Sequence, residues 1–156
     1  MTAPPVDRLA LARWEADRHA AVLGEALARW RTLPTPGLEA IESDPALRQL
    51  TDQILFRFIK LQDAMGERLI PGTLGHLMEP FEGWPMRDRL DRLEKLGYVD
   101  VEAWLRWREL RNRLAHEYPD APDLRYAQLL AAIAGAADML AAYGAWADKL
   151  PAICRS

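Results

Sequence analysis

The stretch DPALRQLTDQILFRFIKLQDAMGERLIPG (residues 44–72) decides the fold class. Its apolar residues recur at steps of three and four, the period of one buried face of an α-helix. These residues are Leu47, Leu50, Ile54, Phe58, Leu61, Met65 and Leu69. Asp44 is a suitable N-cap and Pro45 suits the first helical position, while Pro71 and Gly72 together predict a helix end. We therefore expect one long amphipathic helix that begins at Pro45 and ends before Pro71.

The rest of the chain repeats this helical period, and no stretch shows the alternation typical of β-strands. The further predicted helices run from about Asp7 to Arg31, from Met86 to Leu96, from Val101 to near Tyr118, and from about Asp123 to Leu150. Between residues 72 and 85, glycine and proline predict a long connection. We expect an all-α fold, an antiparallel bundle of about five helices, with residues 1–156 forming one domain.

Composition narrows the function classes. The chain has 156 residues, is half apolar, and carries a net charge of −3, which argues against a protein that coats nucleic acid through a general positive field. No uninterrupted apolar run approaches the roughly 18 residues of a membrane span, and the first residues lack a signal-peptide pattern, so a cytoplasmic protein without a membrane partner is expected. The one cysteine, Cys154, allows no internal disulfide, and the three histidines lack metal-ligand spacing. We expect neither a metal nor another cofactor.

The stretch WLRWRELRNRLAHEYP (residues 104–119) concentrates the residues that could carry chemistry. Asn112 and His116 are four apart and would share a helix face, whereas Arg111 and His116 would lie about 140° apart in projection. One helix therefore cannot easily aim both side chains at one atom. A second copy of the helix across a two-fold axis would supply the missing half, which predicts a homodimer.

These residue types suit phosphoester transfer without a metal. A histidine can accept and return a proton near neutral pH, and a guanidinium matches the charge that develops on a phosphate. In RNA the 2′-hydroxyl is an internal nucleophile. The alternative is structural: Arg111 pairs with a carboxylate, Asn112 bonds a backbone carbonyl, and His116 stabilises a helix C-terminus.

The run from Arg111 to Tyr118 reads R-N-x-x-x-H-x-Y and resembles the R-x4-H-x-Y signature of the HEPN superfamily. It is most similar to the toxins of HEPN and minimal nucleotidyltransferase toxin–antitoxin pairs. The segment LEKLGYVDVEAWLRWRELRNRLAHEYP (93–119) is similar to the third and fourth helices of that family. The segment ILFRFIKLQDAMGERLIP (54–71) is similar to its second helix.

The resemblance implies a HEPN-like helical bundle, a dimer that pairs the signature helices, and an RNase toxin that acts on RNA without a metal. Arg111 and His116 match the catalytic pair, and Asn112 matches the polar residue that often follows the arginine. Tyr118 matches the tyrosine to which the partner nucleotidyltransferase, the antitoxin, attaches AMP. The alternative left open is a non-catalytic HEPN module that only binds such a nucleotidyltransferase.

Other candidates are weaker. Lys60, Asp63 and Glu67 share a helix face and could line a cleft, but a charged stripe of this kind is usually solvated. The six tryptophans could stack on bases, although core or dimer contacts are expected for most of them. His19 and His76 have no partner at catalytic spacing and are interpreted as incidental.

Overall fold

The computed structural model describes residues 7–151, and all of its regular structure is helical. This confirms the prediction of an all-α bundle. Cys154 and the first six residues, on which the disulfide and signal-peptide predictions depend, lie outside the described residues. Within residues 7–151 there is no β-strand.

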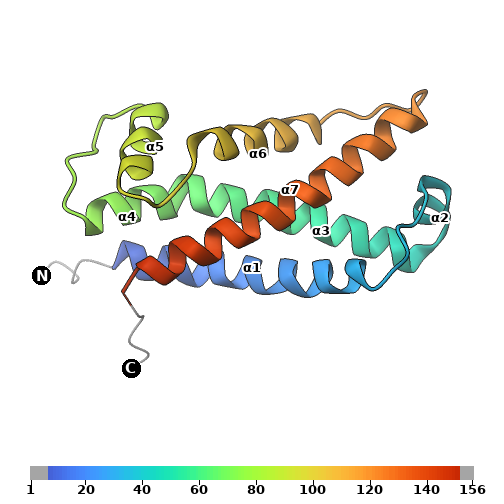
Figure 1. Cartoon of the computed structure of the whole chain (residues 1–156), viewed down its shortest axis with the longest axis horizontal. Coiled ribbons are helices and arrows are strands. Elements are labelled where there is room, and N and C mark those ends of the chain that lie inside the picture. Colours follow the sequence, from blue (N-terminus) through green and yellow to red (C-terminus); the bar gives the residue numbers. More distant parts are fainter. Residues whose placement is uncertain (1–6, 152–156) are drawn as a thin grey trace, which may run out of the picture.

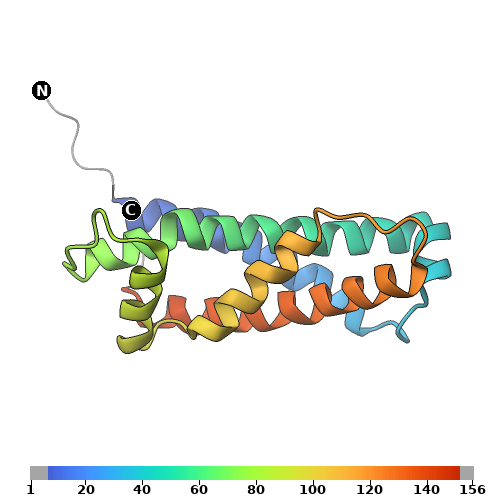
Figure 2. The same ribbon diagram turned by 90° about the horizontal axis from the view of Figure 1, so that it is seen from above.

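Three long rods form the body of the bundle (Figures 1 and 2). The first is α1 (Arg8–Arg31), and the second joins α3 (Pro45–Ala64), a π-helical turn η1 (Met65–Leu69) and α4 (Ile70–His76) end to end. The third is α7 (Pro122–Lys149), which contacts both of the other rods. The side chain of Asp7 caps α1 and that of Asp44 caps α3, as the sequence predicts for Asp44.

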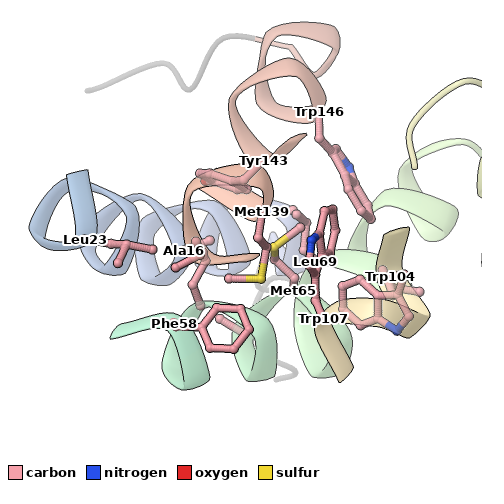
Figure 3. Packing of buried hydrophobic residues seen from close by; sticks show 14 of the residues in the cluster. Ala16, Leu23, Phe58, Met65, Leu69, Trp104, Trp107, Met139, Tyr143 and Trp146 are labelled. Carbon is pink, nitrogen blue, oxygen red and sulfur yellow. The ribbon is translucent and has the colours of Figure 1, made fainter. Parts of the chain in front are cut away.

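One hydrophobic core lies between these rods and α6 (Val101–Arg113), as Figure 3 shows. Of the stripe predicted for the second rod, only Leu47 is not buried. Small residues on α1 such as Ala12 and Ala16 are fully buried and bring the rods close together. On α7 the buried residues include two aromatic ones, Tyr143 and Trp146, while Leu140 and Ala147 are partly buried and pack against the core.

The predicted helix end at Pro71 and Gly72 is wrong. Pro71 has no N–H and its ring would collide with the carbonyl of residue 67 in a regular helix. The π-helical turn removes this conflict, since the Ile70 N–H donates to the carbonyl of Met65 one residue further back, and the helix continues as α4. Gly72 is buried against α1, where a Cβ would lie 3.4 Å from the Cα of Leu9. This glycine serves close helix packing and does not end the helix.

Three shorter helices complete the fold. α2 (Leu38–Ser43) was not predicted, because six residues are too few to show a helical period. α5 (Met86–Lys95) agrees with the predicted helix, and Gly97 follows it in the left-handed region at φ +83°. α6 crosses α7 obliquely near the middle of the bundle and also contacts α3 (Figure 2).

α7 is the one helix within residues 7–151 that is long and apolar enough to cross a membrane by length and composition alone. Buried helices of globular bundles pass the same test. Here α7 packs against α1, α3 and α6, and 39% of its most apolar window is buried inside the bundle.

Candidate functional site

Arg111 lies in the last turn of α6 and forms a two-point ion pair with Asp63 of α3. Its Nε donates to Oδ1 at 3.0 Å and its second terminal nitrogen to Oδ2 at 3.2 Å. Both side chains are about one third exposed, so the pair contributes about 0–1 kcal/mol to stability. Its larger effect is geometric, because two parallel hydrogen bonds fix the plane of the guanidinium. The carboxylate pairing that the structural alternative predicts is therefore present.

A surface hollow of about 480 Å³ opens beside this pair, and we call it the arginine hollow. It lies where α3, η1, α5 and α6 meet, and its lining residues are Gln62, Asp63, Gly66, Glu67, Met86, Arg89, Trp104, Arg108, Arg111 and Asn112. Three arginines and two carboxylate residues thus line it, and the Arg89 guanidinium also lies over the Phe81 ring and donates to the Trp84 carbonyl. The balance leaves one excess positive charge in a chain whose net charge is −3. An anion meets a locally favourable site here.

Two buried polar groups in this hollow have no hydrogen-bond partner among the described residues. They are the side-chain amide of Gln62, whose residue is 4% exposed, and the indole N–H of Trp104, whose residue is 3% exposed. An unsatisfied buried polar group costs about 1–3 kcal/mol, so such groups are uncommon in native cores. Their position in the lining of a surface hollow makes them candidates for ligand contact.

His116 does not lie on α6, and the predicted helix end near Tyr118 is wrong. α6 ends at Arg113, and residues 114–121 run as turns and extended chain toward α7. Asn112 and His116 therefore do not share a helix face, and the projected angle between Arg111 and His116 does not apply. His116 is exposed in this connecting segment.

Side chains of α7 explain the early end of α6. Gln128 Nε2 donates to the carbonyl of Arg113 at 2.7 Å, which satisfies an acceptor that a longer helix would use internally. One terminal nitrogen of Arg125 donates to the carbonyls of Tyr118 and Pro119 at 2.8 and 3.0 Å. These contacts come from the next helix, α7, so the helical period of α6 does not signal them.

His116 and Tyr118 line a second hollow of about 620 Å³, which we call the histidine hollow. It lies between α2, the first half of α3, the connecting segment and the start of α7. Its lining residues are Leu38, Ile41, Glu42, Arg48, Thr51, Asp52, Leu55, Leu114, His116, Glu117, Tyr118, Pro119, Arg125, Gln128 and Leu129. Tyr118 is half-buried there. The two hollows share no lining residue, so one chain separates Arg111 and Asn112 from His116 and Tyr118.

The tryptophans of α6 are buried within the chain itself. Trp104 and Trp107 are each 3% exposed and pack edge-to-face with ring centres 6.4 Å apart. They need no partner copy to cover them, so the core contact, one of the two alternatives expected from the sequence, is the one present. Trp146 is also buried, while Trp14 is 61% exposed under the guanidinium of Arg18.

The remaining sequence candidates fall in different places. Asp63 and Glu67 line the arginine hollow, whereas Lys60 points its ammonium over the ring of Phe56. His76 is exposed at the end of α4. His19 is buried, and its Nδ1 accepts a hydrogen bond from Arg57 at 2.8 Å. Burial is the main cause that lowers the pKa of His19 below its ordinary value of 6.5.

Sequence reasoning missed Arg89, Arg108 and Gln62, which come from three helices and meet only in the folded chain. No group of three or more His, Cys, Asp or Glu side chains among residues 7–151 is arranged to hold a metal ion. Comparison of the chain with protein-family models, curated proteins and solved structures gives no match. The case for a function therefore depends on the two hollows and the residues between them.

Proposed function

We propose that this chain is a metal-independent endoribonuclease and the toxin of a HEPN-type toxin–antitoxin pair, with Arg111, Asn112 and His116 as its catalytic residues. The observation that carries the proposal is the arginine hollow, where Asp63 holds the plane of the Arg111 guanidinium and two further arginines line the same hollow. Such a cluster suits the phosphate of an RNA backbone. His116 follows Arg111 by five residues and is exposed to solvent.

The reaction needs a nucleophile, a base and a stabilised phosphate. His116 takes the proton of a ribose 2′-hydroxyl, and the 2′-oxygen attacks the adjacent phosphorus. The bond from phosphorus to the 5′-oxygen breaks, that oxygen takes a proton from solvent, and a 2′,3′-cyclic phosphate remains. Arg111 stabilises the extra charge of the pentacoordinate state, and Asn112 orients the phosphate.

The separation of the two hollows supports a homodimer in this proposal. Within one chain Arg111 and His116 line different hollows, so each chain offers two half-sites. A two-fold arrangement of the connecting segments would bring the His116 of one copy to the Arg111 of the other.

Cleavage of a single-stranded RNA tests the proposal. We expect Arg111→Ala and His116→Ala each to lower the rate by about 10²-fold or more, the usual scale for such groups. Arg106→Ala and His76→Ala are the matched controls, because both residues are exposed and lie outside the two hollows. The product should carry a 2′,3′-cyclic phosphate, and a chelator should not change the rate. Full activity in His116→Ala, or its loss on chelation, would contradict the proposal.

The proposal assigns regulation to Tyr118, with a minimal nucleotidyltransferase as the antitoxin. Transfer of AMP to the phenol adds a negative charge and bulk at the edge of the histidine hollow, which obstructs RNA. Co-expression with such an enzyme, followed by intact-mass measurement, should show added AMP that disappears in Tyr118→Phe. Tyr126→Phe is the control, since the Tyr126 hydroxyl already donates to the carbonyl of Pro36.

A second candidate is a non-catalytic module that binds a nucleotidyltransferase. The observation that favours it is the Asp63 carboxylate, which neutralises Arg111 in the structure. In this case RNA remains intact with the wild-type chain, and the nucleotidyltransferase still forms a complex with His116→Ala.

A further inference from the structure

The arginine hollow contains more than a phosphate site requires. Phosphate contacts explain its guanidiniums, but they leave the Gln62 amide and the Trp104 indole N–H without a role. Both groups are buried and neither has a partner among residues 7–151. Trp146 provides a contrast within the same core, because its indole N–H donates to the Thr73 hydroxyl at 3.1 Å. The fold therefore gives the buried indole of Trp146 a partner and leaves that of Trp104 without one beside the hollow.

The chemistry of these two groups specifies the ligand. A glutamine amide presents a donor and an acceptor side by side, and the indole adds one more donor. A nucleobase edge carries the complementary row of donors and acceptors. An aliphatic group would leave these polar atoms unpaired, and a bare phosphate has no donor for the amide oxygen unless it is protonated. The residue set thus fits a base whose own phosphate lies among the arginines.

We propose that the arginine hollow is a nucleobase subsite, in which Gln62 and Trp104 bind the base edge while Arg108 and Arg111 bind the adjoining phosphate. Its link to RNA cleavage rests on the function proposed above. Arg108 is exposed and has no ion-pair partner among the described residues, so it is available for the phosphate. Arg111 exchanges its Asp63 contacts for phosphate contacts.

The Gln62 and Trp104 polar atoms are buried, so binding of a base requires a lining side chain to move, and we assign this movement to Met86. This residue begins α5, is half-buried, and lines the hollow together with Gln62 and Trp104. Its unbranched side chain changes rotamer readily, so it acts as a movable cover. The hollow also borders the π-helical turn, at Gly66 and Glu67, and such turns occur frequently at binding sites.

The test measures binding of the four nucleoside 5′-monophosphates and of ribose 5-phosphate to the full chain by calorimetry. We expect at least one nucleotide to bind about tenfold more tightly than ribose 5-phosphate, the effect of one to two net hydrogen bonds. Gln62→Leu should remove this difference. The variant should keep or raise its Tm, because leucine replaces an unpaired buried amide. Gln53→Leu is the control, on an exposed site of the same helix.

A second measurement uses the unmodified chain and does not depend on the folding of a variant. In a nitrogen–proton spectrum, a bound nucleotide should shift the Trp104 indole signal, whereas the Trp146 signal should stay in place because its N–H is already bonded. Ribose 5-phosphate should move neither signal.

Equal binding of all nucleotides and ribose 5-phosphate would overturn the inference, and it would mean that the buried groups hold only water. An unshifted Trp104 signal at saturating nucleotide would overturn it as well. These results are separable from those for the proposed function. Nucleotide binding without RNA cleavage contradicts the ribonuclease alone, whereas cleavage that is indifferent to Gln62→Leu contradicts the base subsite alone.

Discussion

The arginine hollow and the histidine hollow are built from opposite kinds of structure. The first is set between packed helices, with the buried indole of Trp104 beneath it and a two-point ion pair at its edge. The second is bounded by residues 114–121, which belong to no helix, and Arg125 donates to two of their carbonyls, those of Tyr118 and Pro119. The backbone around the first hollow is therefore set by helix packing, whereas that around the second depends on a connecting segment.

This difference shows what a short motif can and cannot encode. Arg111 and His116 are only five residues apart, yet the helix ends between them and their side chains face separate hollows. Chemistry that needs both groups requires either movement of the connecting segment or a second chain. Arg111 is held on a packed helix and His116 lies in a connecting segment that can adjust. This combination suits a site that forms when two chains associate.

The largest expected effect comes from mixing two inactive variants. Arg111→Ala and His116→Ala chains, each about 10²-fold impaired, are unfolded together and refolded as an equal mixture. If the site joins Arg111 of one copy to His116 of the other, about one quarter of the sites regain both residues. RNA cleavage should then recover to about 25% of the wild-type rate, measured per chain.

Two controls define this experiment. A mixture of Arg111→Ala chains with Arg111→Ala, His116→Ala double-variant chains should stay inactive, because no site contains both residues. Light scattering reports whether the mixed sample is dimeric. A monomer with wild-type activity, or a dimer without recovery, would place both residues of the working site in one chain.

The fold was largely accessible from the sequence, because long apolar stripes dominate it. α1 begins and ends within one residue of its predicted bounds, and α5 stops where Gly97 predicts. The exceptions have causes that the apolar stripes do not show. The helix passes Pro71 because a π-helical turn absorbs the conflict, and at the end of α6 the Gln128 side chain of α7 donates to the carbonyl of Arg113.

The candidate site was accessible only in part. The R-N-x-x-x-H-x-Y run identified Arg111, Asn112, His116 and Tyr118, but it could not indicate that they divide between two hollows. Asp63 appeared in the sequence only as one member of a charged stripe. Its pairing with Arg111 spans 48 positions, and sequence periodicity carries no information about such a contact.

The next largest effect concerns the helix packing that supports the arginine hollow. α6 packs on α7 at Gly135, where a Cβ would lie 2.4 Å from Leu110 Cδ1. Gly135→Leu should therefore lower the free energy of unfolding by about 1–3 kcal/mol through overpacking. Because α6 carries Arg111, nucleotide binding in the arginine hollow should weaken as well. Urea unfolding and calorimetry measure the two effects.

Gly144 provides the matched control in the same helix. It is exposed, and no atom lies within 4 Å of the position that its Cβ would occupy. Gly144→Leu should raise the free energy of unfolding by about 0.5–1 kcal/mol, since leucine favours helix over glycine. Equal stability changes at Gly135 and Gly144 would show that α6 is not fixed at this crossing.

A smaller effect is expected from releasing Arg111. Asp63→Asn removes the carboxylate that competes with phosphate for the guanidinium, so single-stranded RNA should bind about threefold more tightly. Stability should fall by no more than about 1 kcal/mol, because the pair is partly exposed. Glu109→Gln is the control, since its pair with Arg113 is more exposed and lies outside both hollows. Weaker RNA binding in Asp63→Asn would mean that the carboxylate positions Arg111 for its ligand.

The smallest expected effect is a change in how the free energy of unfolding depends on pH. It separates the loss of stability from the loss of activity as the pH falls. Any acid loss of activity attributed to the histidine hollow must first be corrected for unfolding. His19 is a buried residue of α1 that contacts Arg57 of α3, and the fold lowers its pKa. It provides the baseline for this correction.

Burial lowers the pKa of His19 from 6.5, and the charges of Arg57, Arg18 and Lys60 lower it further against the opposing effect of Glu15. As the pH falls below about 6.5, the unfolded chain therefore binds more protons than the folded chain. The free energy of unfolding should be constant above this pH and should decrease below it, down to the pKa in the folded state. His19→Gln keeps an acceptor for Arg57 but cannot titrate, so urea unfolding between about pH 8 and pH 5 should show a flatter dependence than in the wild type. If the free energy of unfolding depends on pH equally in both chains, His19 is not the source of the acid sensitivity. The His19→Gln variant then provides no stability correction for the fall in activity.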